Sequence, residues 1–263
     1  MRQAGVAGHF GEYLQGRIGV SGPVALVTLP CPMLRARAVC LPSRGLTLWQ
    51  NAPAVSLSRL ARMLDLCELP RQGRFRLHLT MPLGGGAGAS TAALMALAQA
   101  AGADDAVIPM ACLAVEGASD PMLMPNPAQI LWASRQGRML APMPALPRHA
   151  IIGGFWGQGQ RTDPQDHDFP DISDLIPQWQ TARTLTQFAS LASQSAQRCL
   201  ALRGPAHDPT ASLSHELGAQ GFTIAHTGSA RALIFAPGTV PETAVTDLRA
   251  AGFSRITRWT GGG

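Results

Sequence analysis

The chain has 263 residues, of which 46% are hydrophobic and 14% charged, as in a globular protein of one large or two ordinary domains. All 21 basic residues are arginine, and the missing lysine excludes a Walker A loop, a protein-kinase active site and Schiff-base chemistry on a side chain. The net charge of +5 suits anionic ligands, but the arginines are scattered without interleaved aromatic residues. We therefore expect no nucleic-acid partner, and any nucleotide site must use backbone N–H groups, arginine and metal.

The cysteines and the N-terminus bear on the cellular compartment. The five cysteines form no C-x-x-C pair, and their odd number disfavours a disulfide framework. Residues 1–16 lack the apolar stretch of a secretory signal. These features predict reduced thiols in a cytoplasmic protein.

Strands and helices alternate along the first half of the chain. Residues 22–41 predict two strands that are broken near Pro30. Residues 55–66 have apolar side chains at helical spacing, and Ser56 or Ser58 can cap this helix. The other elements predicted for this half are a strand over 74–81, a helix from about Ser90 and a helix over 109–115.

The proline-rich residues 141–149 predict a domain boundary. Beyond them the pattern predicts a strand over 150–156, an acidic loop over 163–174, one long helix over 173–202, two strands with a glycine turn over 222–235, a helix over 241–252 and a strand over 254–259. Strands and helices thus alternate in both halves, which indicates a mixed α and β fold.

The stretch from Thr80 to Gly102 combines four glycines within residues 84–88 with a long uncharged run. A membrane span is disfavoured, because only about twelve apolar residues follow Thr91 and a span needs about twenty. Two interpretations stay open, a tight strand-to-helix turn without a ligand and an anion-binding loop. The second needs a strand before the loop, glycines that permit positive φ, and a helix start with free N–H groups, and the sequence supplies all three.

The segment "PLGGGAGASTAA" resembles the phosphate loop of the GHMP kinase family, P-x-x-x-G-L-G-S-S-A-A. Six residues match, and Ala87, Ala89 and Thr91 depart from the pattern; the matches are Pro82, Gly86, Gly88, Ser90, Ala92 and Ala93. The resemblance implies that the loop binds the phosphates of ATP and that Ser90 helps to hold Mg²⁺. The nucleotide-binding residues that it implies are Pro82, Gly84, Gly85, Gly86, Ala87, Gly88, Ala89, Ser90 and Thr91.

Two further segments resemble motifs of the same family. "GHFGEYLQG" is similar to G-x-C-G-E-L-x-Q-G, the opening pattern of GHMP kinases that phosphorylate L-threonine, with Phe10 in place of the cysteine. "FTIAHTGSARALIF" resembles the third family motif, in the A-H-T/S-G-S form of that group; without the resemblance it is a plain β-hairpin. The implied substrate-binding residues are Glu12, His226, Thr227, Gly228 and Ser229.

The first 150 residues contain seven carboxylates, and four of them lie in polar turns or at a helix end. "AVEGASDP" resembles the E-P-T-D-S segment of the threonine-phosphorylating group, with Gly117 and Ser119 as departures. The resemblance implies that Asp120 is the general base and that Glu116 is a Mg²⁺ ligand. Arg231 would add positive charge beside the third motif. Thr162 and Asp163 are marginal candidates for the substrate site. The acidic residues 163–174 are expected to form a solvated surface loop or a lid over the substrate.

Together these matches imply an α+β, two-domain GHMP kinase fold. Residues 1–145 would form a domain like ribosomal protein S5 domain 2, and residues 146–263 a ferredoxin-like domain. The implied activity is ATP- and Mg²⁺-dependent phosphorylation of L-threonine to O-phospho-L-threonine for cobalamin biosynthesis. Two alternatives stay open: a GHMP kinase for homoserine or another small alcohol, and a non-catalytic nucleotide-binding protein with the same fold. The sequence predicts no oligomeric state.

Overall fold

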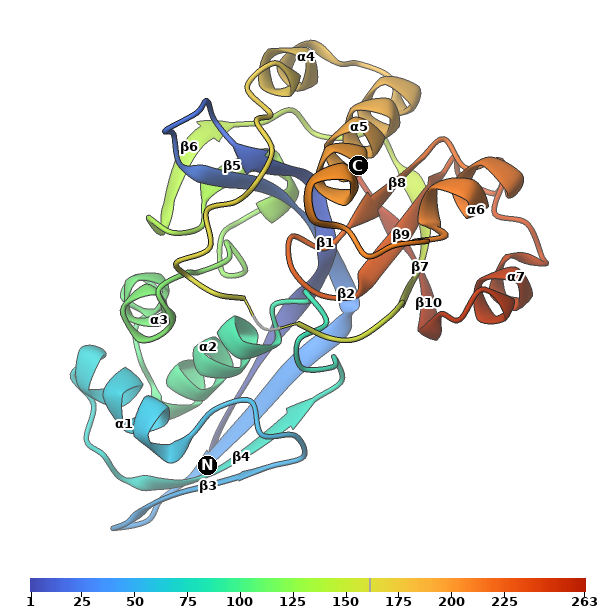
Figure 1. Cartoon of the computed structure of the whole chain (residues 1–263). Helices are drawn as coiled ribbons and strands as arrows, with labels where there is room; N and C mark the ends of the chain where they lie inside the picture. The colour runs from blue at the N-terminus through green and yellow to red at the C-terminus, as the bar shows by residue number, and fades with distance from the viewer. Residues whose placement is uncertain (161) are drawn as a thin grey trace.

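The computed structural model describes residues 1–160 and 162–263. Within these residues ten strands form one sheet, in which eight follow the order β10-β7-β9-β8-β1-β2-β4-β3 while β5 pairs with β2 and β6. The strands of the first half are β1 (Arg2–Arg17), β2 (Val24–Leu41), β3 (Leu46–Gln50), β4 (Gly73–Leu79), β5 (Ile130–Ala133) and β6 (Arg138–Pro142). Figure 1 shows the helices of this half grouped over these strands, apart from those of the second half.

Strands β1 and β2 form a long antiparallel hairpin. The prediction of two strands broken near Pro30 was wrong, because β2 runs unbroken through this region. Its register shifts instead: Gly8 lies opposite Cys31, whereas the preceding residue, Ala7, lies opposite Arg35. The extra residues form a bulge, the place where a strand tolerates proline.

Helix α2 (Ala89–Ala101) is the centre of the first half. It packs on β1, β2 and β4 and is covered by α1 (Leu57–Leu66) and α3 (Ile108–Glu116). Ten of its thirteen residues are buried, so its uncharged sequence reflects contacts on every side. No helix in the described residues is long and apolar enough to cross a membrane. Ser56 caps α1 by accepting a hydrogen bond from the Arg59 N–H, as predicted.

The second half has the β-α-β-β-α-β arrangement of a ferredoxin-like fold, with strand order β10-β7-β9-β8, and this confirms the predicted fold class. Its elements are β7 (His149–Phe155), α4 (Leu175–Thr181), α5 (Leu185–Arg203), α6 (Thr210–Glu216), β8 (Gly221–Ile224), β9 (Ala230–Phe235), α7 (Ala244–Ala250) and β10 (Ser254–Gly261). The division predicted between residues 145 and 146 precedes β7 and stays a prediction.

The single long helix predicted over residues 173–202 was wrong, because two helices occupy this region. The chain is extended at Ala182 and at Thr184. Thr184 then caps α5: its hydroxyl accepts a hydrogen bond from the Gln187 N–H, and the Gln187 side chain accepts one from the Thr184 N–H. This capping box begins a new helix where the apolar spacing alone predicted continuity.

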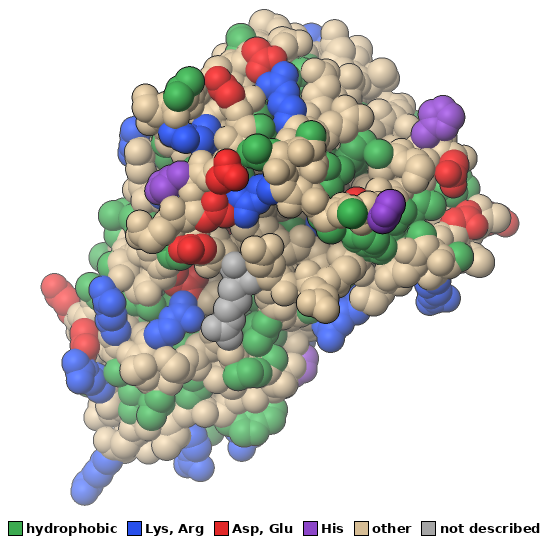
Figure 2. Space-filling model, in the orientation of Figure 1, with side chains coloured by type: hydrophobic (Ala, Val, Ile, Leu, Met, Phe, Trp, Pro, Cys, Tyr) green, Lys and Arg blue, Asp and Glu red, His purple; other side chains and the backbone are tan. Residues whose placement is uncertain are grey.

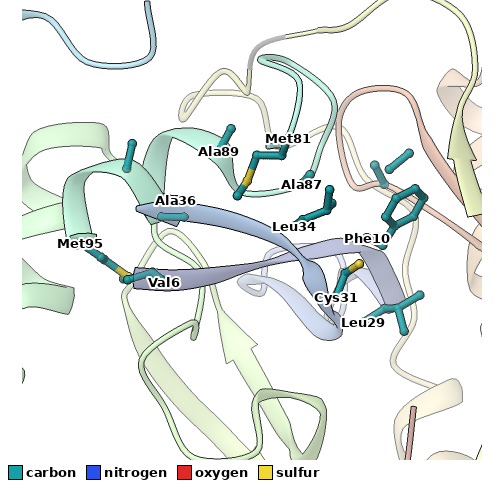
Figure 3. Packing of buried hydrophobic residues seen from close by; sticks show 14 of the residues in the cluster. Val6, Phe10, Leu29, Cys31, Leu34, Ala36, Met81, Ala87, Ala89 and Met95 are labelled. Carbon is teal, nitrogen blue, oxygen red and sulfur yellow. The ribbon is translucent and has the colours of Figure 1, made fainter. Parts of the chain in front are cut away.

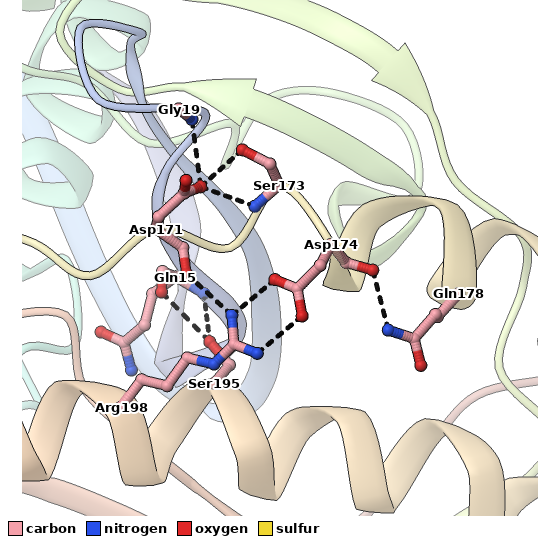
Figure 4. A network of polar contacts seen from close by, with 8 residues as sticks. All are labelled: Gln15, Gly19, Asp171, Ser173, Asp174, Gln178, Ser195 and Arg198. Atoms are coloured by element: carbon pink, nitrogen blue, oxygen red, sulfur yellow. Dashed lines mark hydrogen bonds and ion pairs between the residues drawn. The ribbon is translucent and has the colours of Figure 1, made fainter.

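The two halves meet along β1. Glu12 of β1 pairs with Ile224 of β8, and the Gln15 side-chain amide donates to the Ile224 carbonyl at 2.9 Å. The Ser195 hydroxyl of α5 accepts from the Gln15 N–H and donates to the Gln15 carbonyl, as Figure 4 shows. The shared sheet and several buried polar contacts therefore join the motif strand β1 to the second half.

The aspartates of the acidic loop over residues 163–174 hold the loop against the rest of the protein through ion pairs and a hydrogen bond. Asp174 forms a two-pronged ion pair with Arg198 of α5, at 2.6 and 2.7 Å, and Asp171 accepts a hydrogen bond from the Gly19 N–H (Figure 4). Asp166 pairs with Arg203 at the end of the same helix. On the face drawn in Figure 2, acidic and basic side chains lie next to one another across the middle of the molecule.

A buried ion pair supports the end of β9. Arg231 donates from Nε to the Asp208 carboxylate at 2.8 Å, and both side chains are at most 5% exposed. We expect Arg231→Met to lower the free energy of unfolding by about 3–5 kcal/mol, because it leaves the Asp208 carboxylate buried without its partner. Denaturant unfolding measures this loss.

The matched control is Arg71→Met, which breaks the exposed ion pair between Arg71 and Asp65. We expect the control to change the unfolding midpoint very little, because solvent screens exposed pairs. Equal midpoints for Arg231→Met and the control would contradict a stabilising role for the buried pair.

Candidate active site

The glycine loop connects β4 to α2 and presents unbonded N–H groups. Gly88, the residue before α2, has φ of 67° and makes no side-chain cap. Within the described part of the chain, the N–H groups of Gly86, Ala87 and Gly88 donate no hydrogen bond. The positive end of the α2 dipole lies at the same place, so the loop has the features of an anion-binding site.

The third motif, between β8 and β9, packs directly on the glycine loop. The Gly85 carbonyl accepts hydrogen bonds from the N–H groups of Ser229 at 3.1 Å and Ala230 at 2.8 Å. A Cβ on Gly86 would overlap the Thr227 carbonyl, and a Cβ on Gly228 would overlap the backbone of the glycine loop. Two loops far apart in sequence therefore touch through their backbones, and only glycine fits at the contact.

The two alanines that depart from the phosphate-loop pattern have a packing reason. Ala87 is 1% exposed and Ala89 is 7% exposed. The Ala87 carbonyl accepts a hydrogen bond from the His9 N–H of β1 at 3.3 Å. Figure 3 shows both alanines with Met81 among the buried side chains beside the β1–β2 hairpin. Their methyl groups belong to the hydrophobic core.

Ser90, Thr91 and Glu116 form a cluster of oxygen groups at the start of α2. The Ser90 hydroxyl and the Thr91 hydroxyl both donate to the Glu116 carboxylate at the end of α3, and Arg59 of α1 pairs with the same carboxylate. One carboxylate and two hydroxyls suit Mg²⁺. This ion keeps several of its waters and is usually bound by few protein side chains together with the phosphates of the substrate. The described residues contain no group of three or more His, Cys, Asp or Glu side chains that would hold a metal without a ligand's help.

His9, Glu12 and Asp120 form a second cluster, which is centred on the His9 imidazole. His9 Nδ1 lies 3.4 Å from Glu12 and Nε2 lies 3.5 Å from Asp120. Burial lowers the pKa of His9, but the two carboxylates together raise it above its usual value. Burial raises the pKa of Asp120, but the nearby His9 imidazole outweighs burial and holds it below its usual range.

In this cluster Glu12 is 2% exposed, and burial raises the pKa of its carboxyl group. Asp120 keeps about a fifth of its side chain exposed. The two carboxyl groups therefore differ: Asp120 is open to the cavity and held ionised, whereas Glu12 is enclosed between His9 and the sheet. An ionised, accessible carboxylate suits a proton acceptor.

The rim of the cavity comes from the second half of the chain. Burial and the positive charge of Arg135 lower the pKa of His226 to about 3, so its imidazole is neutral. Both ring nitrogens are buried and have no hydrogen-bond partner among the described residues. The Thr162 hydroxyl lies 2.6 Å from the Thr227 hydroxyl. The Asp163 carbonyl accepts from Arg135, while Asp163's side chain binds its own loop.

One cavity brings together most of the residues that the motifs singled out. Its walls include the glycine loop, both clusters and the third motif, with these residues among them: Glu12, Gly84, Gly85, Gly86, Ala87, Gly88, Ala89, Ser90, Thr91, Glu116, Asp120, Thr162, His226 and Thr227. Pro82, Gly228 and Ser229 lie next to it in the two loops. Arg231, expected beside the phosphates, is instead buried against Asp208 and two carbonyls, so its charge is already compensated.

Three lining residues with basic side chains, His9, Arg59 and Arg135, were missed by the sequence reasoning. His9 stands inside the first motif, three residues before Glu12, and its place beside a predicted carboxylate was the available signal. Arg59 and Arg135 lie outside every motif, and only the packing of α1 and the turn after β5 brings them to the cavity.

The electrostatics of the His9 cluster can be measured directly. We expect Glu12→Gln to lower the pKa of His9, because the substitution removes an attractive carboxylate while burial still opposes the charged imidazole. Histidine side-chain NMR over a pH range measures this pKa, with the His9 signal assigned from His9→Gln. The exposed His78 serves as the reference signal, and an unchanged His9 titration would contradict the proposed contact.

Comparisons with known proteins identify the fold. No protein-family model matches the chain, and no curated protein matches its sequence. A crystal structure of mevalonate kinase matches with a TM-score of 0.65 and 11% identity, over 99% of this chain and 98% of that chain. The L. major mevalonate kinase in complex with R-mevalonate matches with a TM-score of 0.62 and 14% identity, over 99% and 94% of the two chains.

A homoserine kinase from Cytophaga hutchinsonii matches with a TM-score of 0.61 and 15% identity, over 99% of this chain and 95% of that chain. These matches extend over nearly the whole length of both partners, so they include both halves of the sheet. At these identities the likeness is one of architecture. The chain has the α+β, two-domain fold of the GHMP kinases.

Proposed function

We propose that the protein is an ATP-dependent kinase that phosphorylates the hydroxyl group of a small molecule. The observation that carries this proposal is one cavity holding both an ionised carboxylate, Asp120, and a glycine loop with unbonded N–H groups. Phosphoryl transfer needs these two things above all, a site for the phosphates and a group that orients or deprotonates the acceptor hydroxyl.

In this proposal the loop from Pro82 to Thr91 binds the ATP phosphates through its N–H groups and the α2 terminus. The acceptor oxygen attacks the γ-phosphorus while its proton passes to the Asp120 carboxylate. The bond between the γ-phosphorus and the bridging oxygen breaks, and ADP leaves. Ser90 and Glu116 would hold Mg²⁺, which when bound neutralises charge on the phosphates. Residues 1–145 supply these groups, and residues 146–263 supply the loop that covers them.

We propose L-threonine as the acceptor, giving O-phospho-L-threonine for cobalamin biosynthesis. Support for an amino acid comes from the walls of the cavity, where the Arg135 guanidinium and the Asp120 carboxylate both line the space and interact through their charges. A cation and an anion in one cavity can bind the carboxylate and the ammonium group of an amino acid, respectively. The neutral His226, with Thr227, Gly228 and Ser229 in the same loop, would add hydrogen bonds.

Homoserine is the second candidate, because solved homoserine kinases share the fold and the same two charges fit a second amino acid. A substrate panel separates the candidates. We expect phosphorylated product with threonine at a higher kcat/KM than with serine, homoserine or mevalonate. Nucleotide binding without product from any alcohol would instead support the non-catalytic alternative.

Replacing the base tests the chemistry. We expect Asp120→Asn to reduce kcat by about 10²–10⁴-fold, because asparagine keeps the side-chain shape but accepts no proton. ATP affinity, measured by calorimetry, should stay within a few-fold of the original value.

The matched control is Asp105→Asn, a carboxylate in the exposed turn after α2 that binds only the Gln99 side chain in the described residues. This variant should keep normal turnover. Near-normal turnover in Asp120→Asn as well would show that Asp120 is not the base.

A further inference from the structure

Arg59 occupies the place where the proposed function requires a metal ion. Its Nη2 atom lies 3.2 Å from the Ser90 hydroxyl and pairs with the Glu116 carboxylate, and Ser90 donates to the same carboxylate oxygen. These are the two side chains proposed to hold Mg²⁺. The guanidinium therefore already provides the positive charge that balances Glu116 in the chain without ligands.

A guanidinium and a divalent cation compete for the same carboxylate oxygen, because their positive charges repel each other at contact distance. The Glu116 side chain is 11% exposed, whereas the Arg59 side chain keeps a third of its surface exposed. Arg59 also lines the cavity beside the glycine loop. Of the two partners in this ion pair, Arg59 is the more exposed.

The nearest new partner for Arg59 is a phosphate group. Ser90, which it contacts, is the second residue of α2, and the unbonded N–H groups of Gly86 to Gly88 precede that helix directly. Arginine binds phosphate in two-pronged geometry and is weakly hydrated, so it transfers between a carboxylate and a phosphate without a large solvation cost.

We propose that Arg59 excludes divalent cations from Ser90 and Glu116 in the nucleotide-free protein and moves to the nucleotide phosphates when they bind. Free metal then binds weakly, and metal enters with the nucleotide. Arg59 is thus a phosphate-binding residue outside every motif of the sequence. The inference rests on the proposed nucleotide site, but not on turnover of any alcohol.

A different role for Arg59 predicts different results. If Arg59 only ties α1 to α2 and α3, its removal lowers stability and loosens the cluster, and metal and nucleotide affinity fall together. In the proposed role the two affinities change in opposite directions. Measuring both therefore separates the two roles.

The experiment uses Arg59→Met, which keeps the side-chain stem, and Arg62→Met as the matched control on an exposed position of the same helix. Binding of Mn²⁺ alone is measured by electron paramagnetic resonance. We expect Arg59→Met to bind Mn²⁺ about tenfold more tightly than the unchanged protein, since one repelling charge is gone. Adding Glu116→Gln to this variant should abolish the gain.

The second measurement is calorimetric binding of ADP in the presence of a chelator. We expect Arg59→Met to bind metal-free ADP about tenfold more weakly, because it lacks one charge-assisted phosphate contact. Arg62→Met should change neither affinity. Unchanged or weaker Mn²⁺ binding, or unchanged ADP binding, in Arg59→Met overturns the proposal.

Thermal unfolding checks that each variant is folded. If Arg59→Met does not fold, Arg59→Gln takes its place, because glutamine keeps a hydrogen bond to the cluster without the charge, and the same two outcomes apply. Failure of the kinase proposal would look different: ADP would not bind to the unchanged protein at all, or would bind without any alcohol being phosphorylated.

Discussion

The site depends on the backbone contact between the glycine loop and the third motif. Gly85 accepts two hydrogen bonds from the start of β9, and Gly86 and Gly228 leave no space for a side chain where the loops meet. The β1–β8 pairing brings the two halves into register, and this contact then sets the separation of their loops. The two loops form part of the cavity wall, so this contact fixes the distance between the glycine loop and Thr227.

Charge in the cavity is arranged in two separate clusters, and each has a cation at its centre. His9 lies between Glu12 and Asp120, and Arg59 lies against Glu116. A protein without lysine has only arginine and histidine for this purpose. In the proposed function, histidine would serve the acceptor side, where a proton must move, and arginine the phosphate side, where a fixed charge is useful.

Local signals predicted the local structure well and the cavity only in part. The Ser56 cap, the helix after the glycine loop and the strand–turn–strand around Gly228 could all be predicted, because each depends on neighbours in sequence. The continuity of β2 and the break before α5 depend on a bulge and a capping box, which override apolar spacing. Arg59 and Arg135 carry no motif, and only tertiary packing brings them to the site.

The burial of Ala87 and Ala89 affects the conformational entropy that the glycine loop would lose when a nucleotide binds. The two buried methyl groups pack the loop on the hydrophobic core, and backbone hydrogen bonds fix it to the third motif. The loop is therefore already ordered without a ligand. A binding site that is ordered beforehand spends little conformational entropy when its ligand arrives. Larger or more polar residues at these two positions would leave the loop free and make each binding event order it anew.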